Sequence, residues 1–167
     1  MNDLIILSTL LPGPKHGYQL KREAGIILGQ GVLHNNLVYP LLRRFMNDKW
    51  VSRTTVPGER GQMRHLYAIT ALGRKELLAR LSAFSEQDAR SSDHFRFRVG
   101  MFQLLDAESR LRILEARERF LTLRLEKLTA VETKFPLDRY ASEVTSQFRS
   151  ETHSELDWIK RLRKTSN

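Results

Sequence analysis

Residues 36–70 read NLVYPLLRRFMNDKWVSRTTVPGERGQMRHLYAIT and contain one helical pattern followed by two strand-like patterns. The helical pattern covers about Asn36–Asp48, because apolar residues recur there at positions i, i+3, i+4 and i+7. These residues are Val38, Leu41, Leu42 and Phe45. The pattern predicts an amphipathic helix with its apolar side in the core. Asn35 or Asn36 is the expected N-cap, since an amide oxygen can accept a hydrogen bond from a free first-turn amide.

The polar side of this predicted helix carries amide, phenol and guanidinium groups. Asn36, Tyr39 and Arg43 lie opposite the apolar stripe, and Asn35, Arg44 and Asn47 lie at its start or on its flanks. Such groups contact phosphates and base edges in DNA, where Arg favours guanine and Asn favours adenine. An ordinary solvated helix face has the same composition, so this face alone does not decide between DNA and solvent.

Two strands are predicted after the helix. β-Branched and aromatic residues are frequent in about Trp50–Val56 and Met63–Ile69, and the Pro/Gly-rich segment 57–61 separates the two runs. This is the pattern of a β-hairpin, and three arginines lie on it or beside it: Arg53, Arg60 and Arg64. Arg60 at the tip is suited to a narrow A/T-rich minor groove, and contact with phosphate alone is an equally good interpretation.

Helical patterns flank this stretch on both sides. The apolar segment Asn2–Leu11 is ended by Pro12-Gly13-Pro14, and an amphipathic helix over about His16–Leu28 leaves Lys15, Lys21 and Arg22 outside its apolar stripe as candidate DNA contacts. Thr70 is the expected N-cap of a fourth helix that runs to about Ala83. Helix, helix, helix, hairpin, helix is the order of a winged helix-turn-helix, in which one helix enters the ~12 Å major groove and the hairpin reaches the adjacent minor groove.

The second half of the chain is predicted to be a pair of long antiparallel helices. Ser82–Asp93 is polar and is interpreted as a helix end plus connector, which divides the chain into a DNA-binding domain, 1–83, and a helical dimerisation domain, 84–167. The sequence that follows Asp93 has apolar spacing that fits a strand or a helix, and we favour a helix because no partner strand is evident. Asp106 is the expected cap of a helix to about Phe135, and a last helix follows over about Leu137–Arg163.

The apolar residues of these long helices are the candidate dimer contacts: Leu114, Leu121, Leu125, Leu128, Phe135, Tyr140, Val144, Phe148, Ile159 and Leu162. Two helices of this length have more apolar surface than a small winged domain covers, so we expect a second chain to cover them. The predicted fold class is therefore mainly α with a small β wing: an N-terminal winged helix-turn-helix plus a C-terminal antiparallel long-helix dimerisation domain.

The charge distribution favours a polyanionic partner for the first half. The 167 residues include 28 Lys and Arg and 19 Asp and Glu, for a net charge of +9. There are 12 basic and 5 acidic residues up to Arg80, and 16 basic and 14 acidic residues beyond it. The excess of positive charge thus lies in the first half, where double-stranded DNA is the expected partner.

Other classes of protein are disfavoured by what the sequence lacks. Without cysteine there is no disulfide and no thiolate metal site. Leu4–Leu7, the longest apolar run, is far shorter than the ~20 residues of a membrane span, so we expect a cytoplasmic protein that has no membrane partner. HExxH, GxSxG and P-loop motifs are missing, and His153 and Asp157 are better interpreted as an exposed ion pair than as a catalytic pair. We therefore expect no enzyme activity, no cofactor and no metal.

Three motifs resemble the PadR family of bacterial transcriptional regulators, in particular its members with a long helical C-terminal region, including the virulence-activator-like branch. They are His16-Gly17-Tyr18-Gln19-Leu20, Val38-Tyr39-Pro40-Leu41-Leu42-Arg43-Arg44, and Tyr67-x-Ile69-Thr70-x-x-Gly73. The resemblance implies a homodimeric winged-helix regulator, usually a repressor, whose C-terminal helices are exchanged across the dimer. It implies contact of Tyr39 with the DNA backbone, and packing, DNA contact or both for Tyr18. Some relatives release DNA on binding phenolic acids, so a small aromatic effector is a further possibility.

Two departures from the family pattern limit what can be transferred. The family commonly has a glycine before the first wing strand, where this chain has Lys49 and Trp50, and it often has small or polar residues where Leu37 and Val38 stand. The base preference of relatives therefore does not carry over. The alternative interpretation is a winged-helix and coiled-coil interaction protein that docks another protein or RNA.

Overall fold

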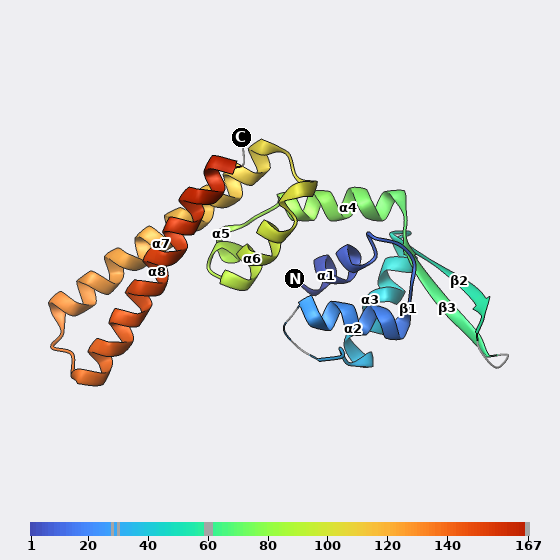
Figure 1. Ribbon diagram of the computed structural model, residues 1–167, viewed down its shortest axis with the longest axis horizontal. Helices are drawn as coiled ribbons and strands as arrows, with labels where there is room; N and C mark the ends of the chain where they lie inside the picture. The colour runs from blue at the N-terminus through green and yellow to red at the C-terminus, as the bar shows by residue number, and fades with distance from the viewer. Residues whose placement is uncertain (28, 30, 59–61, 166–167) are drawn as a thin grey trace. The chain divides into compact units, whose positions relative to one another are not determined.

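The computed structural model describes residues 1–27, 29, 31–58 and 62–165. The chain forms two compact units, Met1–Leu81 and Ser82–Asn167 (Figure 1). The first contains α1 (Asn2–Thr9), β1 (Lys15–His16), α2 (Gly17–Ile27), α3 (Asn35–Asn47), β2 (Val51–Pro57), β3 (Met63–Ile69) and α4 (Ala71–Ser82). The second contains α5 (Glu86–Ala89), α6 (Ser92–Gly100), the 3₁₀ turn η2 (Phe102–Leu104), α7 (Ala107–Lys134) and α8 (Arg139–Thr165). The mainly helical fold with a small antiparallel sheet confirms the predicted class.

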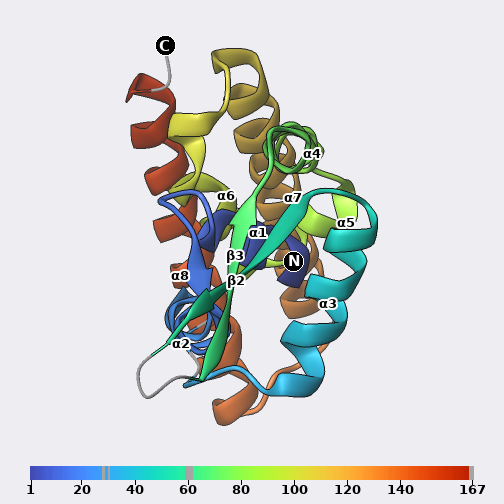
Figure 2. The same ribbon diagram turned by 90° about the vertical axis from the view of Figure 1, so that its right-hand side faces the viewer.

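The sheet of the first unit is a hairpin with a short third strand. Its order is β1-β3-β2, and β2 pairs with β3 from Val51 opposite Ile69 to Pro57 opposite Met63 (Figure 2). This confirms the predicted hairpin, whose central residues 59–61, including Arg60, lie outside the described residues. Strand β1 was not predicted, because two residues are too few to show a strand period.

The core of the first unit forms between α1 and the apolar sides of α2, α3 and α4. Leu7 of α1, Leu20 of α2 and Leu77 of α4 are fully buried. On α3, three of the four residues predicted to face the core are buried and the fourth, Leu41, is half-buried. Each fully buried aliphatic or aromatic side chain contributes roughly 1.5–3 kcal/mol. The orientation of α3 is thus fixed by its apolar stripe, and the opposite side is left to solvent.

The two ends of α3 differ from the prediction in instructive ways. The N-cap is His34, and the Asn35 side chain instead accepts a hydrogen bond from Lys21, so the predicted asparagine cap is wrong. At the other end, Lys49 adopts a left-handed conformation with φ of 61°. The Trp50 amide donates to the Phe45 carbonyl at 2.8 Å, and the Lys49 amide donates to that of Met46 at 3.1 Å.

This pair of bonds is a Schellman motif, and the Phe45 and Trp50 rings, 5.5 Å apart between centroids, supply its hydrophobic contact. Left-handed backbone is the conformation that glycine adopts most easily. Lys49 therefore ends α3 in the conformation that suits the glycine common before the first wing strand in the PadR family.

The start of α4 is fixed to the same corner through the Trp50 carbonyl. Its oxygen accepts hydrogen bonds from the Thr70 amide at 2.9 Å and the Thr70 hydroxyl at 3.2 Å. Thr70 Oγ1 also accepts from the Gly73 amide at 3.0 Å, which confirms Thr70 as the cap. A Cβ on Gly73 would lie 2.1 Å from the Trp50 carbonyl oxygen, so only glycine fits there. Backbone packing at this corner therefore requires a capping residue at position 70 and a glycine three residues later.

The second unit is built on an antiparallel pair of long helices, α7 and α8, which run side by side (Figure 1). The Asp106 side chain accepts from the Ser109 amide at 2.6 Å, which confirms the predicted cap of α7. Between the helices, the buried Arg117 guanidinium makes two 2.8 Å hydrogen bonds to the two oxygens of the Glu155 carboxylate. Arg117 also donates to the Ala89 carbonyl at 2.6 Å, which ties α5 to the pair.

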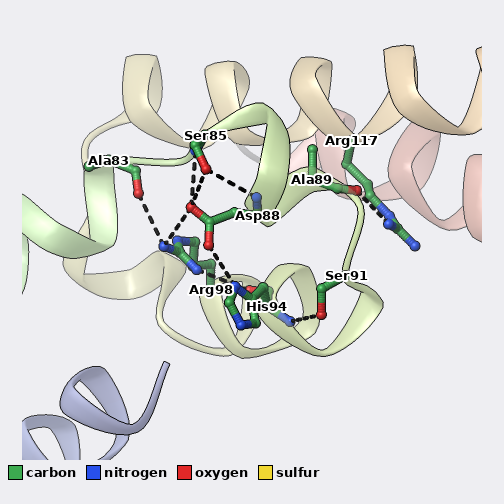
Figure 3. A network of polar contacts seen from close by, with 8 residues as sticks. All are labelled: Ala83, Ser85, Asp88, Ala89, Ser91, His94, Arg98 and Arg117. Carbon is green, nitrogen blue, oxygen red and sulfur yellow. Dashed lines mark hydrogen bonds and ion pairs between the residues drawn. The ribbon is translucent and has the colours of Figure 1, made fainter.

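The segment predicted as a connector contains a short helix and the start of another. Figure 3 shows Asp88 at the centre of this region. Its carboxylate accepts from the Ser85 amide and hydroxyl at 3.1 and 2.9 Å, contacts His94 Nδ1 at 2.6 Å, and lies 3.6 Å from Arg98. The sequence predicted a helix end plus connector here and missed α5, because side-chain capping, rather than apolar periodicity, builds this turn. The predicted helix after it is confirmed as α6.

Much of the apolar surface in the outer half of the α7–α8 pair is open. Leu114, Leu121 and Ile159 are buried, and Leu125, Leu128 and Leu162 are half-buried. The remaining four candidate dimer contacts are exposed: Phe135 (53%), Tyr140 (79%), Val144 (53%) and Phe148 (40%). Over the described ranges, none of the helices is both long enough and apolar enough to cross a membrane.

Candidate nucleic-acid interface

The polar side of α3 is exposed as predicted. Asn36, Tyr39 and Arg43 are all accessible. Arg43 has no carboxylate within ion-pair distance among the residues that the structure describes. No described neighbour therefore neutralises its positive charge, which is the state of an arginine available for a phosphate or a base edge.

Tyr39 is held against the first residue of α2. A Cβ on Gly17 would lie 3.0 Å from the Tyr39 hydroxyl oxygen, closer than most side chains tolerate. The glycine of the His-Gly-Tyr motif thus allows the tyrosine of the Tyr-Pro motif to lie beside it. Two sequence signatures that are more than twenty residues apart meet in one contact.

A hollow of about 510 Å³ lies next to this contact. Its lining comes from α2, α3 and the sheet: His16, Gly17, Tyr18, Gln19, Tyr39, Arg64, His65 and Tyr67. His16 Nδ1 lies 3.3 Å from the His65 carbonyl oxygen, and the His65 ring lies 3.2 Å from the Thr55 hydroxyl. Sequence reasoning named His16 only as part of a motif and did not single out His65, because only the unforeseen pairing of β1 with β3 brings the two histidines together.

On the wing, Arg53 is anchored through Tyr67. The two residues are opposite each other in the register of β2 and β3, and Tyr67 is buried. Burial, with the adjacent Tyr39, raises the pKa of the Tyr67 hydroxyl, and the charge of Arg53 and its hydrogen bond offset this only in part. Tyr67 therefore stays protonated in the physiological range, and it lines the hollow. Arg64, from the facing strand, packs across Gly58.

The positively charged residues near α2 fall into two groups. Lys21 Nζ donates to Asn35 Oδ1 at 2.7 Å and lies 5.8 Å from the centre of the Tyr18 ring, so these residues form one cluster at the start of α3. Arg22 is exposed on the same helix. Lys15 differs from the expectation, because it is buried and its Nζ lies 2.8 Å from Glu23 Oε2. The hydrogen bond from Lys15 contributes most to the lowered pKa of the Glu23 carboxyl.

Arg44 is the second predicted residue whose surroundings differ from the expectation. It is ion-paired with Asp3 of α1, and its guanidinium lies 5.1 Å from the centre of the Phe45 ring. The structure thus brings together the exposed face of α3, the Lys21–Asn35–Tyr18 cluster and the described arginines of the wing. It sets Lys15 apart in the core and Arg44 in an ion pair.

Residues 6–79 match the model of the transcriptional regulator PadR-like family. No curated protein is significantly similar in sequence. Among solved structures, a proposed transcriptional regulator from Thermoplasma acidophilum is 33% identical over 46% of this chain and 72% of its own, with a TM-score of 0.42.

Two further similar structures carry the family's name. PadR from Bacillus subtilis, in complex with operator DNA, is 16% identical over 99% of this chain and 98% of its own, with a TM-score of 0.47. A PadR family transcription regulator from Clostridium difficile is 20% identical over 47% of this chain and 81% of its own, with a TM-score of 0.41. From the family match, which covers most of the winged unit and all three sequence motifs, we conclude that the chain belongs to the PadR-like family of transcriptional regulators.

Proposed function

We propose that this protein binds double-stranded DNA as a homodimer and regulates transcription, with α3 in the major groove and the β2–β3 wing at the adjacent minor groove. The observation that carries the proposal is the exposed face of α3, where Arg43 keeps an unneutralised charge and Tyr39 is fixed by Gly17. Tyr39 and the Lys21 cluster would contact phosphates, and Arg43 and Asn36 would contact base edges.

A second copy of the chain is the proposed cover for the open apolar surface of α7 and α8. Tyr140, Val144 and Phe148 recur every four residues on α8, so they form a stripe on one side of that helix. A dimer would present two copies of α3 to a pseudo-palindromic operator whose half-sites lie about one helical turn, ~34 Å, apart. Occupation of a promoter would then be sufficient for repression.

A small aromatic effector fits a second hollow, of about 610 Å³, between α5 and α7. Phe120, Leu123 and Val131 supply apolar lining, and Arg90 and Arg119 are among the cations at the same hollow. An aromatic acid would bury its ring there and pair its carboxylate with a guanidinium. Such a ligand regulates DNA binding only if its affinity differs between the DNA-bound and free dimers.

The DNA-binding proposal is tested by selecting fragments of the source genome with the purified full-length protein and footprinting the recovered DNA. Arg43→Ala should weaken binding to a recovered fragment by about 1–3 kcal/mol and relax the preference at one base position. Lys75→Ala is the control, because it removes a positive charge from an exposed position of α4 outside the proposed interface. If no fragment is preferred over bulk DNA, the proposal is wrong. Equal binding of single-stranded RNA would favour the docking-module alternative.

The dimer is tested separately by light scattering. Tyr140→Lys combined with Val144→Lys should convert the protein to a monomer, because two charges would be buried in the interface. Ser146→Lys places the same charge on another side of α8 and should leave the dimer intact. A monomeric wild-type protein at micromolar concentration would contradict the proposed assembly.

A further inference from the structure

Two adjacent arginines on α3 have opposite electrostatic surroundings. Arg43 has no carboxylate partner within the described part of the chain, whereas Arg44 is paired with Asp3. The side chain of Arg44 is still 48% exposed, so it lies at the surface and is held there by the carboxylate. Sequence alone does not reveal the pairing of Arg44, because Asp3 is about forty residues away in the chain.

The Asp3 carboxylate is itself held in place by a second arginine. Arg80 Nη1 lies 3.2 Å from Asp3 Oδ2, and Arg80 Nε donates to Glu76 Oε1 at 2.6 Å. The Arg80 guanidinium also lies 4.7 Å from the centre of the Trp50 ring. Two guanidinium groups and two carboxylates therefore form one network whose charges cancel, and it joins the start of α1 to α3 and α4.

A paired arginine contributes little to DNA binding. A cation that neutralises a phosphate releases a counterion. Each such contact makes the slope of log affinity against log salt concentration more negative by about 0.9. Arg44 would first have to leave Asp3, and the remaining network of Asp3, Glu76 and Arg80 would then carry a net negative charge close to the phosphates and repel them. On this basis we propose that Asp3 withholds Arg44 from the DNA backbone and so limits the affinity for DNA of any sequence. This inference rests on the proposed function.

The test is Asp3→Asn in the full-length protein, with fluorescence anisotropy on a duplex of unrelated sequence and on a genomic fragment that the wild type prefers. Both affinities should rise by a similar factor, because phosphate contacts do not depend on sequence. For each bound copy of the chain, the gain at 50 mM salt should exceed the gain at 200 mM by about 3.5-fold, since the slope steepens by about 0.9.

Three variants separate this effect from a general change in charge. Arg44→Ala alone should neither raise the affinity nor steepen the slope, and combined with Asp3→Asn it should abolish the gain. Glu76→Gln removes the same charge from the network without touching Arg44, and should give no comparable gain. A gain that persists in the double variant, or an Asp3→Asn protein that binds more weakly or with an unchanged slope, would overturn the inference.

A second measurement does not depend on DNA or on the folding of a variant. Phenylglyoxal labelling of the wild-type protein, followed by mass spectrometry, should modify Arg44 several-fold more slowly than Arg43, because Asp3 holds the Arg44 guanidinium. Equal rates would contradict the proposal. If neither the wild type nor Asp3→Asn binds any duplex, the proposed function fails and this inference with it, whereas wild-type binding without the Asp3 effect refutes the inference alone.

Discussion

Replacement of Lys49 by glycine should stabilise the winged unit. A residue with a Cβ in the left-handed region, such as Lys49 at φ 61°, is strained by roughly 1–2 kcal/mol. Glycine removes this strain, but its greater freedom in the unfolded chain costs about 0.4–1 kcal/mol. The expected net gain is therefore about 0.5–1 kcal/mol, and the Schellman hydrogen bonds of Trp50 and Lys49 are backbone bonds that glycine retains.

The assay is urea unfolding in a Trp158→Phe background, in which Trp50 alone reports. With an m-value of about 1–1.5 kcal/mol/M for a unit of this size, the midpoint should rise by about 0.3–1 M. Lys49→Ala keeps the Cβ and should give no comparable gain. Asp48→Gly is the matched control, because Asp48 has right-handed helical backbone, with φ −76°, and gains nothing from glycine. If Lys49→Gly leaves the midpoint unchanged, or if Lys49→Ala raises it equally, the reasoning from backbone strain is refuted.

Three further predictions test other parts of the fold. Gly73→Ala should destabilise the winged unit by at least 2–3 kcal/mol in the same urea assay, because its Cβ would overlap the Trp50 carbonyl; a loss below 1 kcal/mol would show that α4 shifts freely. Glu155→Ala should lower the free energy of unfolding, measured by calorimetry, by about 3–5 kcal/mol, because the buried Arg117 charge loses its partner. Arg117→Met combined with Glu155→Leu should recover most of this loss. A double variant as unstable as Glu155→Ala would count against this account. Burial opposes the ionised form of Asp88, but hydrogen bonds from His94 and Ser85 outweigh it and lower the pKa of Asp88. The ionised carboxylate therefore stabilises the fold above the ordinary carboxyl pKa of about 3.9, and this stabilisation is lost as the pH falls through the lowered value. The difference in unfolding free energy between wild type and Asp88→Asn should therefore shrink from pH 5 to pH 2, and a constant difference would argue against ionic stabilisation by Asp88.

The elements that the sequence pattern predicted correctly are those with a clear period or a strong cap. Val38, Leu42 and Phe45 place α3 by their spacing, and Thr70 and Asp106 are caps whose side-chain oxygens accept the hydrogen bonds expected of them. The missed elements have no period to detect. Strand β1 has two residues and exists only because β3 lies beside it, and α5 depends on reciprocal bonds between Ser85 and Asp88.

The candidate interface was predictable as a face but not as a set of charges. Helical spacing correctly predicted that Tyr39 and Arg43 are exposed, because residues opposite the buried apolar stripe of a helix face solvent. It could not show that Lys15 is buried against Glu23 or that Arg44 is paired with Asp3, because such pairs depend on how segments distant in sequence pack together. Spacing predicts which side of a helix faces outward, and tertiary structure decides which charges on that side remain unneutralised.

The carbonyl of Trp50 has a consequence for how such a regulator could change its target. The exit of α3, the base of the wing and the first turn of α4 all meet at this single main-chain oxygen, through groups that make no use of the outward side chains of α3. The end of α3 is thus held by backbone atoms, and in the proposed function its base contacts come from outward side chains that this corner does not need. If α3 binds DNA as proposed, exchanging a few of these outward residues changes the preferred operator and leaves the position of the helix end unchanged.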